Sequence, residues 1–177
     1  MHPRLAELQS YLDRERANLD QALGELESSR HQERPAEGRW CATQVVEHLA
    51  IIDRRVATLL DGEIAKARQA GVGPDPSTDS VLGSIDAAKV IDRSQRYQNP
   101  RAEPQGVPST EDALKSLDQA RAGFKAMLRN ADGVDLTKVV APHPLFGPLN
   151  GYQWIAFTAA HMARHADQIR EIARELS

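Results

Sequence analysis

The chain has 177 residues and a mass of 19.5 kDa, with 22 Lys and Arg against 25 Asp and Glu, which gives a formal net charge of −3. This balance excludes a strongly basic fold, so neither nucleic acid nor an anionic membrane surface is an expected partner. No apolar run approaches the roughly 20 residues that span a bilayer, and the first residues lack the layout of a signal peptide. Cys41 has no second cysteine to pair with, which suits a reducing compartment. We therefore expect a single cytoplasmic domain over residues 1–177.

Two amphipathic helices are predicted in the first 70 residues. The first runs from about Pro3 to Ser29, where leucines recur at steps of three, four or seven residues. The second begins near Thr43, after a loop over residues 30–39, and its apolar pattern fades near Gly71. Its apolar positions fall within a sector roughly 100° wide, which predicts one buried face.

A long segment from Gly71 to Pro108 follows the second helix. It holds five prolines and many small polar residues, and one short helix is expected between Asp79 and Ser94. Because a loop of this length in a compact domain is usually functional or mobile, we expect this segment to cover a pocket.

Two further helices are predicted in the remainder of the chain. The third starts at Ser109 or Thr110, whose hydroxyl groups suit an N-cap. The fourth starts after Asn150 as N-cap, with Gln153 three residues later as a variant of the capping box, and runs to the C-terminus. Residues 132–148 between them are predicted to be an irregular connection, without a β-alternation. Four long helices with a dominant seven-residue spacing predict an all-α protein, an antiparallel four-helix bundle with one long crossover connection.

Three histidines are the candidate site. His161 and His165 lie four residues apart near the centre of the buried stripe of the fourth helix, so their imidazoles project side by side. His48 borders the buried face of the second helix. If these two helices are neighbours, the three rings converge, and three neutral imidazoles suit Zn, Ni, Fe, Mn or Co. The alternative interpretation is that the rings fill a polar pocket by packing and hydrogen bonding alone.

Other polar residues are expected around these histidines. Gln168 lies on the same helix face and is the preferred partner for the second nitrogen of a ligating imidazole, ahead of Asp167, which falls off the buried stripe. Tyr152 and Arg164 are further candidates for this role. Glu47 points about 100° away from the neighbouring histidine and is expected to be exposed to solvent.

Three short motifs resemble those of the DinB/YfiT-like superfamily. The segment Trp40–Leu49 reads WCATQVVEHL, which is similar to the Trp-[Ser/Thr]-…-His-Leu signature of that family. The segment His161–Ile169 is similar to its His-x-x-x-His-x-x-Gln-Ile motif, and His143–Gly147 resembles its His-Pro-x-x-Gly segment. The order and the spacing of the motifs agree across nearly the whole chain.

The resemblance implies a four-helix bundle in which His48, His161 and His165 hold a divalent metal, such as Zn, Ni, Fe or Mn. Characterised relatives include transferases and isomerases that use low-molecular-weight thiols, and family members frequently form homodimers. We therefore expect a metal-dependent enzyme that transfers a thiol to, or hydrolyses, a small electrophilic molecule. Thiol transfer is preferred because no carboxylate is expected beside the histidines as a general base. The alternative is a non-catalytic metal-binding or stress-related helical dimerisation module.

Two residues need separate interpretation. Cys41 stands where the family usually has Ser or Thr, so either Thr43 caps the second helix or the cap is weaker. A thiol at a helix N-terminus is a candidate reactive thiolate, but a small buried apolar side chain is the favoured interpretation. His143, between Pro142 and Pro144, is predicted to lie in a structural turn near the end of the bundle, with a place in the lining of the site as the alternative.

Overall fold

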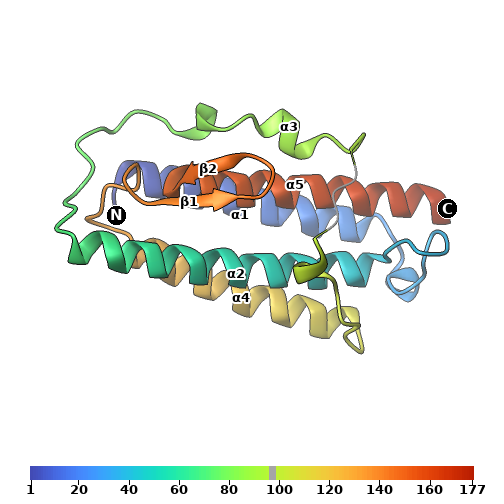
Figure 1. The fold of residues 1–177 in the computed structure, drawn as a ribbon. Helices are drawn as coiled ribbons and strands as arrows, with labels where there is room; N and C mark the ends of the chain where they lie inside the picture. The colour runs from blue at the N-terminus through green and yellow to red at the C-terminus, as the bar shows by residue number, and fades with distance from the viewer. Residues whose placement is uncertain (96–98) are drawn as a thin grey trace.

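The computed structural model describes residues 1–95 and 99–177 and contains four long helices packed as a bundle (Figure 1). It confirms the predicted fold class and the long crossover. The long helices are α1 (Pro3–Gly24), α2 (Ala42–Gln69), α4 (Thr110–Asn130) and α5 (Gly151–Leu176). The short elements are η1 (Ser28–Arg30), η2 (Leu82–Ser84), α3 (Ala87–Ile91), η3 (Pro100–Ala102), β1 (Val140–His143) and β2 (Gly147–Asn150).

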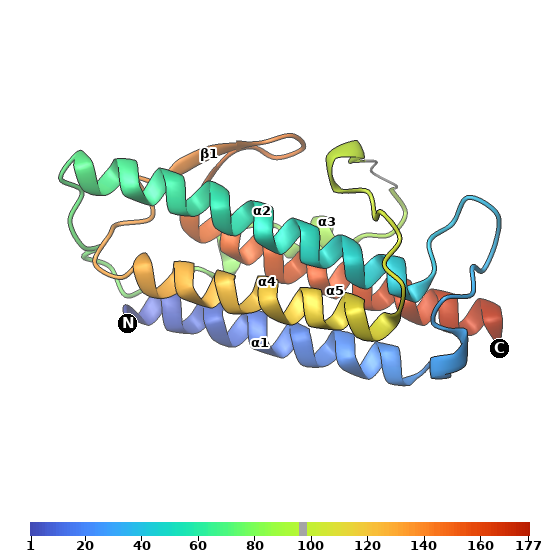
Figure 2. The same cartoon turned by 90° about the horizontal axis from the view of Figure 1, so that it is seen from below.

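The crossover between α2 and α4 decides how the helices run relative to one another. It returns along the length of the bundle, so α4 starts at the same end of the molecule as α2 (Figures 1 and 2). The two most extensive helix contacts, α2 with α4 and α1 with α5, therefore join helices that run in the same direction. The antiparallel arrangement holds between α1 and α2, between α4 and α5, and between α2 and α5.

The predicted helix starts agree with the observed caps. The Ser109 side chain accepts a hydrogen bond from the backbone N–H of Asp112. Asn150 and Gln153 form the reciprocal capping box expected at the start of α5, with distances of 2.9 and 3.0 Å. The first helix is shorter than predicted, because it ends at Gly24 instead of Ser29. Leu26 beyond its end is nevertheless buried, so the leucine spacing continues past the helix itself.

The connection over residues 132–148, predicted to be irregular, carries an antiparallel β-hairpin. Ala141 pairs with Leu149, and His143 pairs with Gly147, which has a φ of +71° that glycine adopts without strain. Each strand has four residues, too few for a recognisable alternation. The Trp154 indole N–H of α5 donates to the Ala141 carbonyl oxygen at 3.1 Å, which fastens the hairpin to the bundle.

The short helix predicted between Asp79 and Ser94 is present as α3, which is shorter than that range and is preceded by η2. Residues 96–98 of the expected covering segment lie outside the described residues. α3 packs on α5, so the middle of the crossover lies along that helix.

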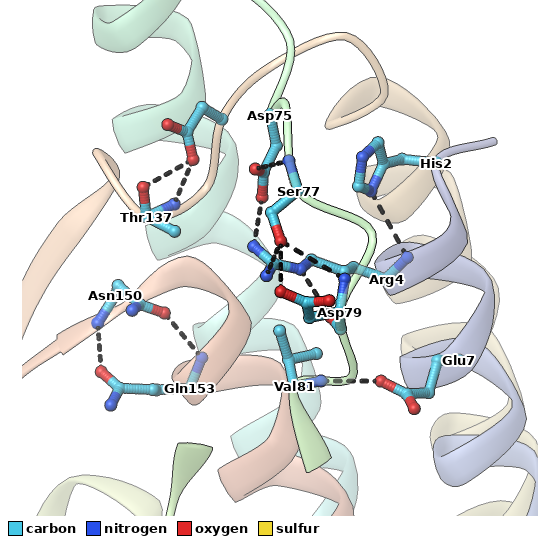
Figure 3. Close-up of polar contacts among 11 residues, drawn as sticks. His2, Arg4, Glu7, Asp75, Ser77, Asp79, Val81, Thr137, Asn150 and Gln153 are labelled. Carbon is cyan, nitrogen blue, oxygen red and sulfur yellow. Dashed lines mark hydrogen bonds and ion pairs between the residues drawn. The ribbon is translucent and has the colours of Figure 1, made fainter. Parts of the chain in front are cut away.

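The start of the crossover is held by α1 (Figure 3). The Arg4 guanidinium donates to Asp75 Oδ2 at 2.7 Å, to Ser77 Oγ at 2.6 Å and to the carbonyl oxygen of Asp79 at 2.8 Å. The same guanidinium lies over the Tyr152 ring, 5.5 Å from its centroid. Tyr152 was a candidate partner for the histidines, but it lies in the first turn of α5. At a rise of 1.5 Å per residue, it is about 13 Å along the helix axis from His161.

The apolar core forms two clusters, one toward each end of the bundle. On every long helix a polar residue lies between the members of the two clusters: Glu15 on α1, Asp53 on α2, Arg121 on α4 and His161 on α5. We call these four residues the polar layer. Within the described part of the chain, no helix has an apolar stretch long enough to cross a membrane.

Candidate functional site

The structure brings the three predicted histidines together from two helices. One ring nitrogen from each of His48, His161 and His165 lies within 4.8 Å of the others. The Nε2 atoms of His161 and His165 are 3.2 Å apart, and the His48 ring centroid is 5.3 and 4.8 Å from those of His161 and His165. His48 and His165 are buried, and His161 is half-buried. We call these residues the histidine cluster.

Hydrogen bonds set the tautomers of two of these rings. His48 Nδ1 is 2.7 Å from the carbonyl oxygen of Ala102, which can only accept, so this nitrogen carries the proton and Nε2 keeps its lone pair. His165 Nδ1 donates in the same way to Gln168 Oε1 at 2.8 Å, as predicted. The Gln168 oxygen also accepts from Arg93 at 3.3 Å. Asp167 pairs with a different residue, Arg170, at 3.1 Å.

His161 has the least satisfied ring. Its Nδ1 is buried and has no hydrogen-bond partner among the described residues, while its Nε2 faces His165. Leaving one buried polar atom unpaired costs about 1–3 kcal/mol. Among the described residues, the His161 ring is therefore held by packing, with the Phe157 ring stacked on it at 5.5 Å, and not by a hydrogen bond at Nδ1.

Burial keeps the histidine cluster neutral. Burial is the main cause that lowers the pKa of His48, and it lowers the pKa values of His161 and His165 well below their ordinary value. Neighbouring histidines lower the pKa values of His161 and His165 further. The positive charge of Arg164 also lowers the pKa of His161, and that of Arg93 lowers the pKa of His165. Neutral rings with free lone pairs are the form in which histidine binds a metal.

These lowered pKa values predict that the metal-free protein is less stable in mild acid. Below a pH of about 6.5 the unfolded histidines bind protons that the buried rings do not, so the free energy of unfolding falls as the pH drops. Each such ring contributes a slope of up to about 1.4 kcal/mol per pH unit. Asp53 opposes this trend, because burial raises its pKa to about 6 and its folded form takes up a proton first.

Urea unfolding of the metal-free protein at pH 7.5 and 5.5 measures this dependence. In the variant His161→Phe, which removes one titrating ring, the loss of stability between the two pH values should be smaller by up to about 1.4 kcal/mol, because only the pH unit below about 6.5 contributes. Equal losses for the two proteins would contradict the assignment of His161 as a ring that stays neutral in the folded protein.

Glu47 was predicted to be exposed, and this prediction is wrong. Its side chain is buried and accepts three backbone hydrogen bonds, from the N–H groups of Gln105, Gly106 and Val107 at 2.8, 3.0 and 3.3 Å. The helical pattern of α2 cannot reveal this contact, because the covering residues come from the end of the crossover. Both carboxylate oxygens are therefore occupied, and Glu47 fixes the crossover beside His48.

Two arginines attach the middle of the crossover to α5. Arg164 was considered a partner for the ligating imidazoles, but its guanidinium donates to the carbonyl oxygens of Val90 at 3.2 Å, of Gln95 at 2.5 Å and of Asp92. Arg93 of the crossover pairs with Glu171 at 2.7 Å. The crossover thus contacts two of the three histidines, His48 directly through Ala102 and His165 indirectly through Gln168.

The buried carboxylates of the described residues all have partners of their own. Glu47 is the buried carboxylate next to His48, and both of its oxygens accept backbone hydrogen bonds from the crossover. The pairs are Glu15 with Arg14 and Asn18, Glu47 with the crossover amides, Asp53 with Arg121, and Asp75 with Arg4.

Cys41 is the N-cap residue of α2, and its side chain is buried. Its backbone N–H donates to Gln44 Oε1 at 3.2 Å, which supports the start of the helix. Thr43 does not take over the cap, because its hydroxyl donates to the His31 carbonyl oxygen at 3.2 Å. The burial agrees with the interpretation of Cys41 as a small packed side chain.

Aromatic rings flank the histidine cluster on both sides. The Trp40 ring lies 5.0 Å from His48, and the Phe157 ring stacks on His161 at 5.5 Å between centroids. Phe157 was not singled out from the sequence, although its spacing of four residues before His161 places the two on one helix face. Beyond it lies His143, at the end of β1, whose ring centroid is 4.4 Å from that of Phe157.

Comparison with known proteins agrees with this architecture. A protein of Bacillus subtilis (strain 168), described as "Uncharacterized protein YuaE", is 24% identical over 157 residues, which cover 85% of this chain and 88% of that protein. The crystal structure of TT2238, a four-helix bundle protein, superposes with a TM-score of 0.64 at 22% identity and covers 94% of this chain and 98% of its own. The family model of the DinB superfamily matches residues 11–169. Since that match spans most of the sequence, the chain belongs to the DinB superfamily.

Proposed function

We propose that His48, His161 and His165 bind one divalent transition metal, such as Zn, Ni, Fe or Mn, and that the protein is a metal-dependent enzyme. The proposed reaction is the transfer of a low-molecular-weight thiol to a small electrophilic molecule. One observation carries the proposal: three neutral imidazoles from two helices present their ring nitrogens within 4.8 Å of one another.

The spacing of the ring nitrogens supports a metal ligand set. Zinc binds histidine nitrogen at about 2.0–2.1 Å, so two nitrogens of a tetrahedral site lie about 3.3 Å apart. The Nε2 atoms of His161 and His165 are 3.2 Å apart, close to that value. The widest separation in the cluster, 4.8 Å, requires a modest rotation of a ring toward the others. The bonds from His48 to Ala102 and from His165 to Gln168 leave both Nε2 lone pairs available.

The surroundings of the cluster favour thiol transfer over hydrolysis. A bound ion of this kind supplies Lewis-acid activation, which lowers the pKa of a thiol or water that it binds. Hydrolysis commonly uses a carboxylate or histidine as general base in addition, and every buried carboxylate of the described residues is paired elsewhere. In thiol transfer the new bond joins sulfur to the electrophilic carbon as the bond between that carbon and its leaving group breaks, and the thiol proton passes to the leaving group or to solvent.

Elemental analysis of the purified protein, combined with a chelator melt, tests metal binding. We expect about one transition-metal ion per chain and a lower melting temperature after removal of the ion with EDTA. Adding the preferred ion back at 100 times its dissociation constant should stabilise the fold by about 2.7 kcal/mol. A metal-free protein whose melting is indifferent to EDTA and to all four ions would support the non-catalytic helical module.

A screen of thiols then tests the reaction. The protein with its ion restored is incubated with a cellular thiol and a panel of small electrophiles, and loss of free thiol is followed. Consumption should require the thiol, the electrophile and the ion together, with the metal-free protein as control. Consumption of electrophile without thiol would show hydrolysis instead.

A further inference from the structure

One segment of the crossover binds two neighbouring residues of α2. We call residues 100–107 the η3 segment, and its helical turn packs against α2 (Figure 2). The carbonyl oxygen of Ala102 accepts a hydrogen bond from His48 Nδ1 at 2.7 Å. The Glu47 carboxylate accepts from the three consecutive backbone N–H groups of residues 105–107. The same short segment therefore contacts a candidate metal ligand and the residue that precedes it.

The Glu47 carboxylate is well suited to hold this segment. Its side chain is buried, and consecutive backbone N–H groups that converge on one anion are a recurrent anion-binding arrangement. Hydrogen bonds to an ionised acceptor are about twice as strong as those between neutral groups. Gly106 permits the arrangement because its φ is +89°, which side-chain-bearing residues rarely adopt. In the described part of the chain no ion pair includes Glu47, so its charge is stabilised there by backbone N–H groups.

The bond from Ala102 decides which nitrogen of His48 can bind a metal. A carbonyl oxygen only accepts, so the proton stays on Nδ1 and the lone pair of Nε2 remains available. Partners of this kind fix the tautomer and the ring orientation of a ligating histidine, and their loss typically costs about 10- to 100-fold in metal affinity. The position of this backbone oxygen depends on how the η3 segment is anchored, and three residues further along the chain its anchor is Glu47.

We propose that Glu47 is a positioning residue of the metal site, which acts through the η3 segment and binds neither the metal nor the substrate. This inference rests on the proposed function and adds a coupling to it: the docked segment keeps His48 in the form that binds the ion, so the bound ion stabilises the docked segment. Such a coupling is reciprocal, so docking raises metal affinity by the same factor as the ion raises the docking equilibrium. The alternative is that Glu47 holds a loop without any effect on the metal.

Two variants release the η3 segment from opposite sides. Glu47→Gln has nearly the same shape, but its amide N–H₂ group cannot accept a bond from the backbone. Gly106→Pro leaves the carboxylate intact, but proline has no N–H and cannot adopt a φ of +89°. In each variant the affinity for Zn²⁺, measured by competition with a chelating dye, should fall about 10- to 100-fold. Because Gly106→Pro keeps the negative charge, a loss in both variants cannot come from that charge alone.

Glu7→Gln is the matched control. Glu7 of α1 also binds the crossover, where it accepts from the Val81 backbone N–H at 2.9 Å and from the Ser80 hydroxyl at 2.7 Å (Figure 3). This contact holds the start of the crossover near the N-terminal end of α1. The same chemical change at this position should leave the affinity for Zn²⁺ unchanged.

Amide hydrogen exchange measures the coupling in the wild-type protein without any variant. While the η3 segment is docked, Glu47 holds the N–H groups of residues 105–107, and they exchange only when the segment opens. Saturation with Zn²⁺ should slow their exchange by the same factor of about 10 to 100. The N–H group of Val81, which Glu7 binds, should exchange at an unchanged rate.

The outcomes distinguish this inference from the proposed function. If the wild-type protein binds no Zn²⁺, the proposed function fails, and the coupling fails with it. If Zn²⁺ binds the wild type and both variants equally, and exchange at residues 105–107 does not respond to the ion, Glu47 is not a positioning residue while metal binding stands. A loss confined to Glu47→Gln, with Gly106→Pro unaffected, would assign the effect to the charge of Glu47 and would also overturn the role of the η3 segment.

Discussion

The variant His161→Ala should lose at least about 100-fold in metal affinity. Structural zinc sites gain about 10–16 kcal/mol from four ligands, so one ligand contributes about 3 kcal/mol. The metal-free variant should lose little stability, because the substitution also removes the buried Nδ1 that has no partner among the described residues. Isothermal titration with Zn²⁺ and thermal melts with and without the ion measure the two effects separately.

His2→Ala is the matched control for this experiment. His2 is another partly buried histidine, but it caps α1 at the N-terminal end of the bundle through a 3.3 Å bond from the Arg4 backbone N–H (Figure 3). Its removal should lower the melting temperature slightly and leave the metal content unchanged. If His161→Ala purifies with the same metal content as the wild type, the histidine cluster is not the metal site.

The variant Asp53→Ala should be destabilised by about 3–5 kcal/mol, because it leaves the Arg121 guanidinium buried without its carboxylate. Arg121 Nε lies 3.2 Å from Asp53 Oδ2, and the two side chains are 7% and 1% exposed. The remaining contacts of Arg121 are weak, with Nη2 3.2 Å from the Met162 sulfur and Nη1 without a hydrogen-bond partner in the described residues. Urea unfolding at pH 7.5 measures the loss.

A double variant and a surface variant make this result specific. Asp53→Leu combined with Arg121→Met removes both charges and should recover most of the lost stability, because apolar residues of similar volume replace buried ion pairs at little cost. Asp20→Ala breaks the exposed pair with Arg16 and should cost less than about 1 kcal/mol. Equal losses for Asp53→Ala and Asp20→Ala would show that the polar layer is hydrated.

The sequence determined the helices and the faces that they bury. Leucine spacing on α1 and the apolar sector of α2 correspond to observed buried faces, and the caps at Ser109 and Asn150 lie where hydrogen-bonding chemistry placed them. His161 and His165 were expected side by side because a helix places residues i and i+4 on one face. Gln168 was expected to bind one of these histidines for the same reason.

Only the tertiary structure decided which segments cover those faces. Glu47 is buried because residues 105–107 of the crossover bind its carboxylate, and His143 lies beside the site because a short hairpin folds against Trp154. Asp53 pairs with Arg121 because α4 runs beside α2. The length of the crossover allows this arrangement, but the sequence of the crossover does not specify it. Helical periodicity reports that a face is buried, but contacts between residues far apart in the chain depend on the path of the loops, for which a single sequence has no periodic signal.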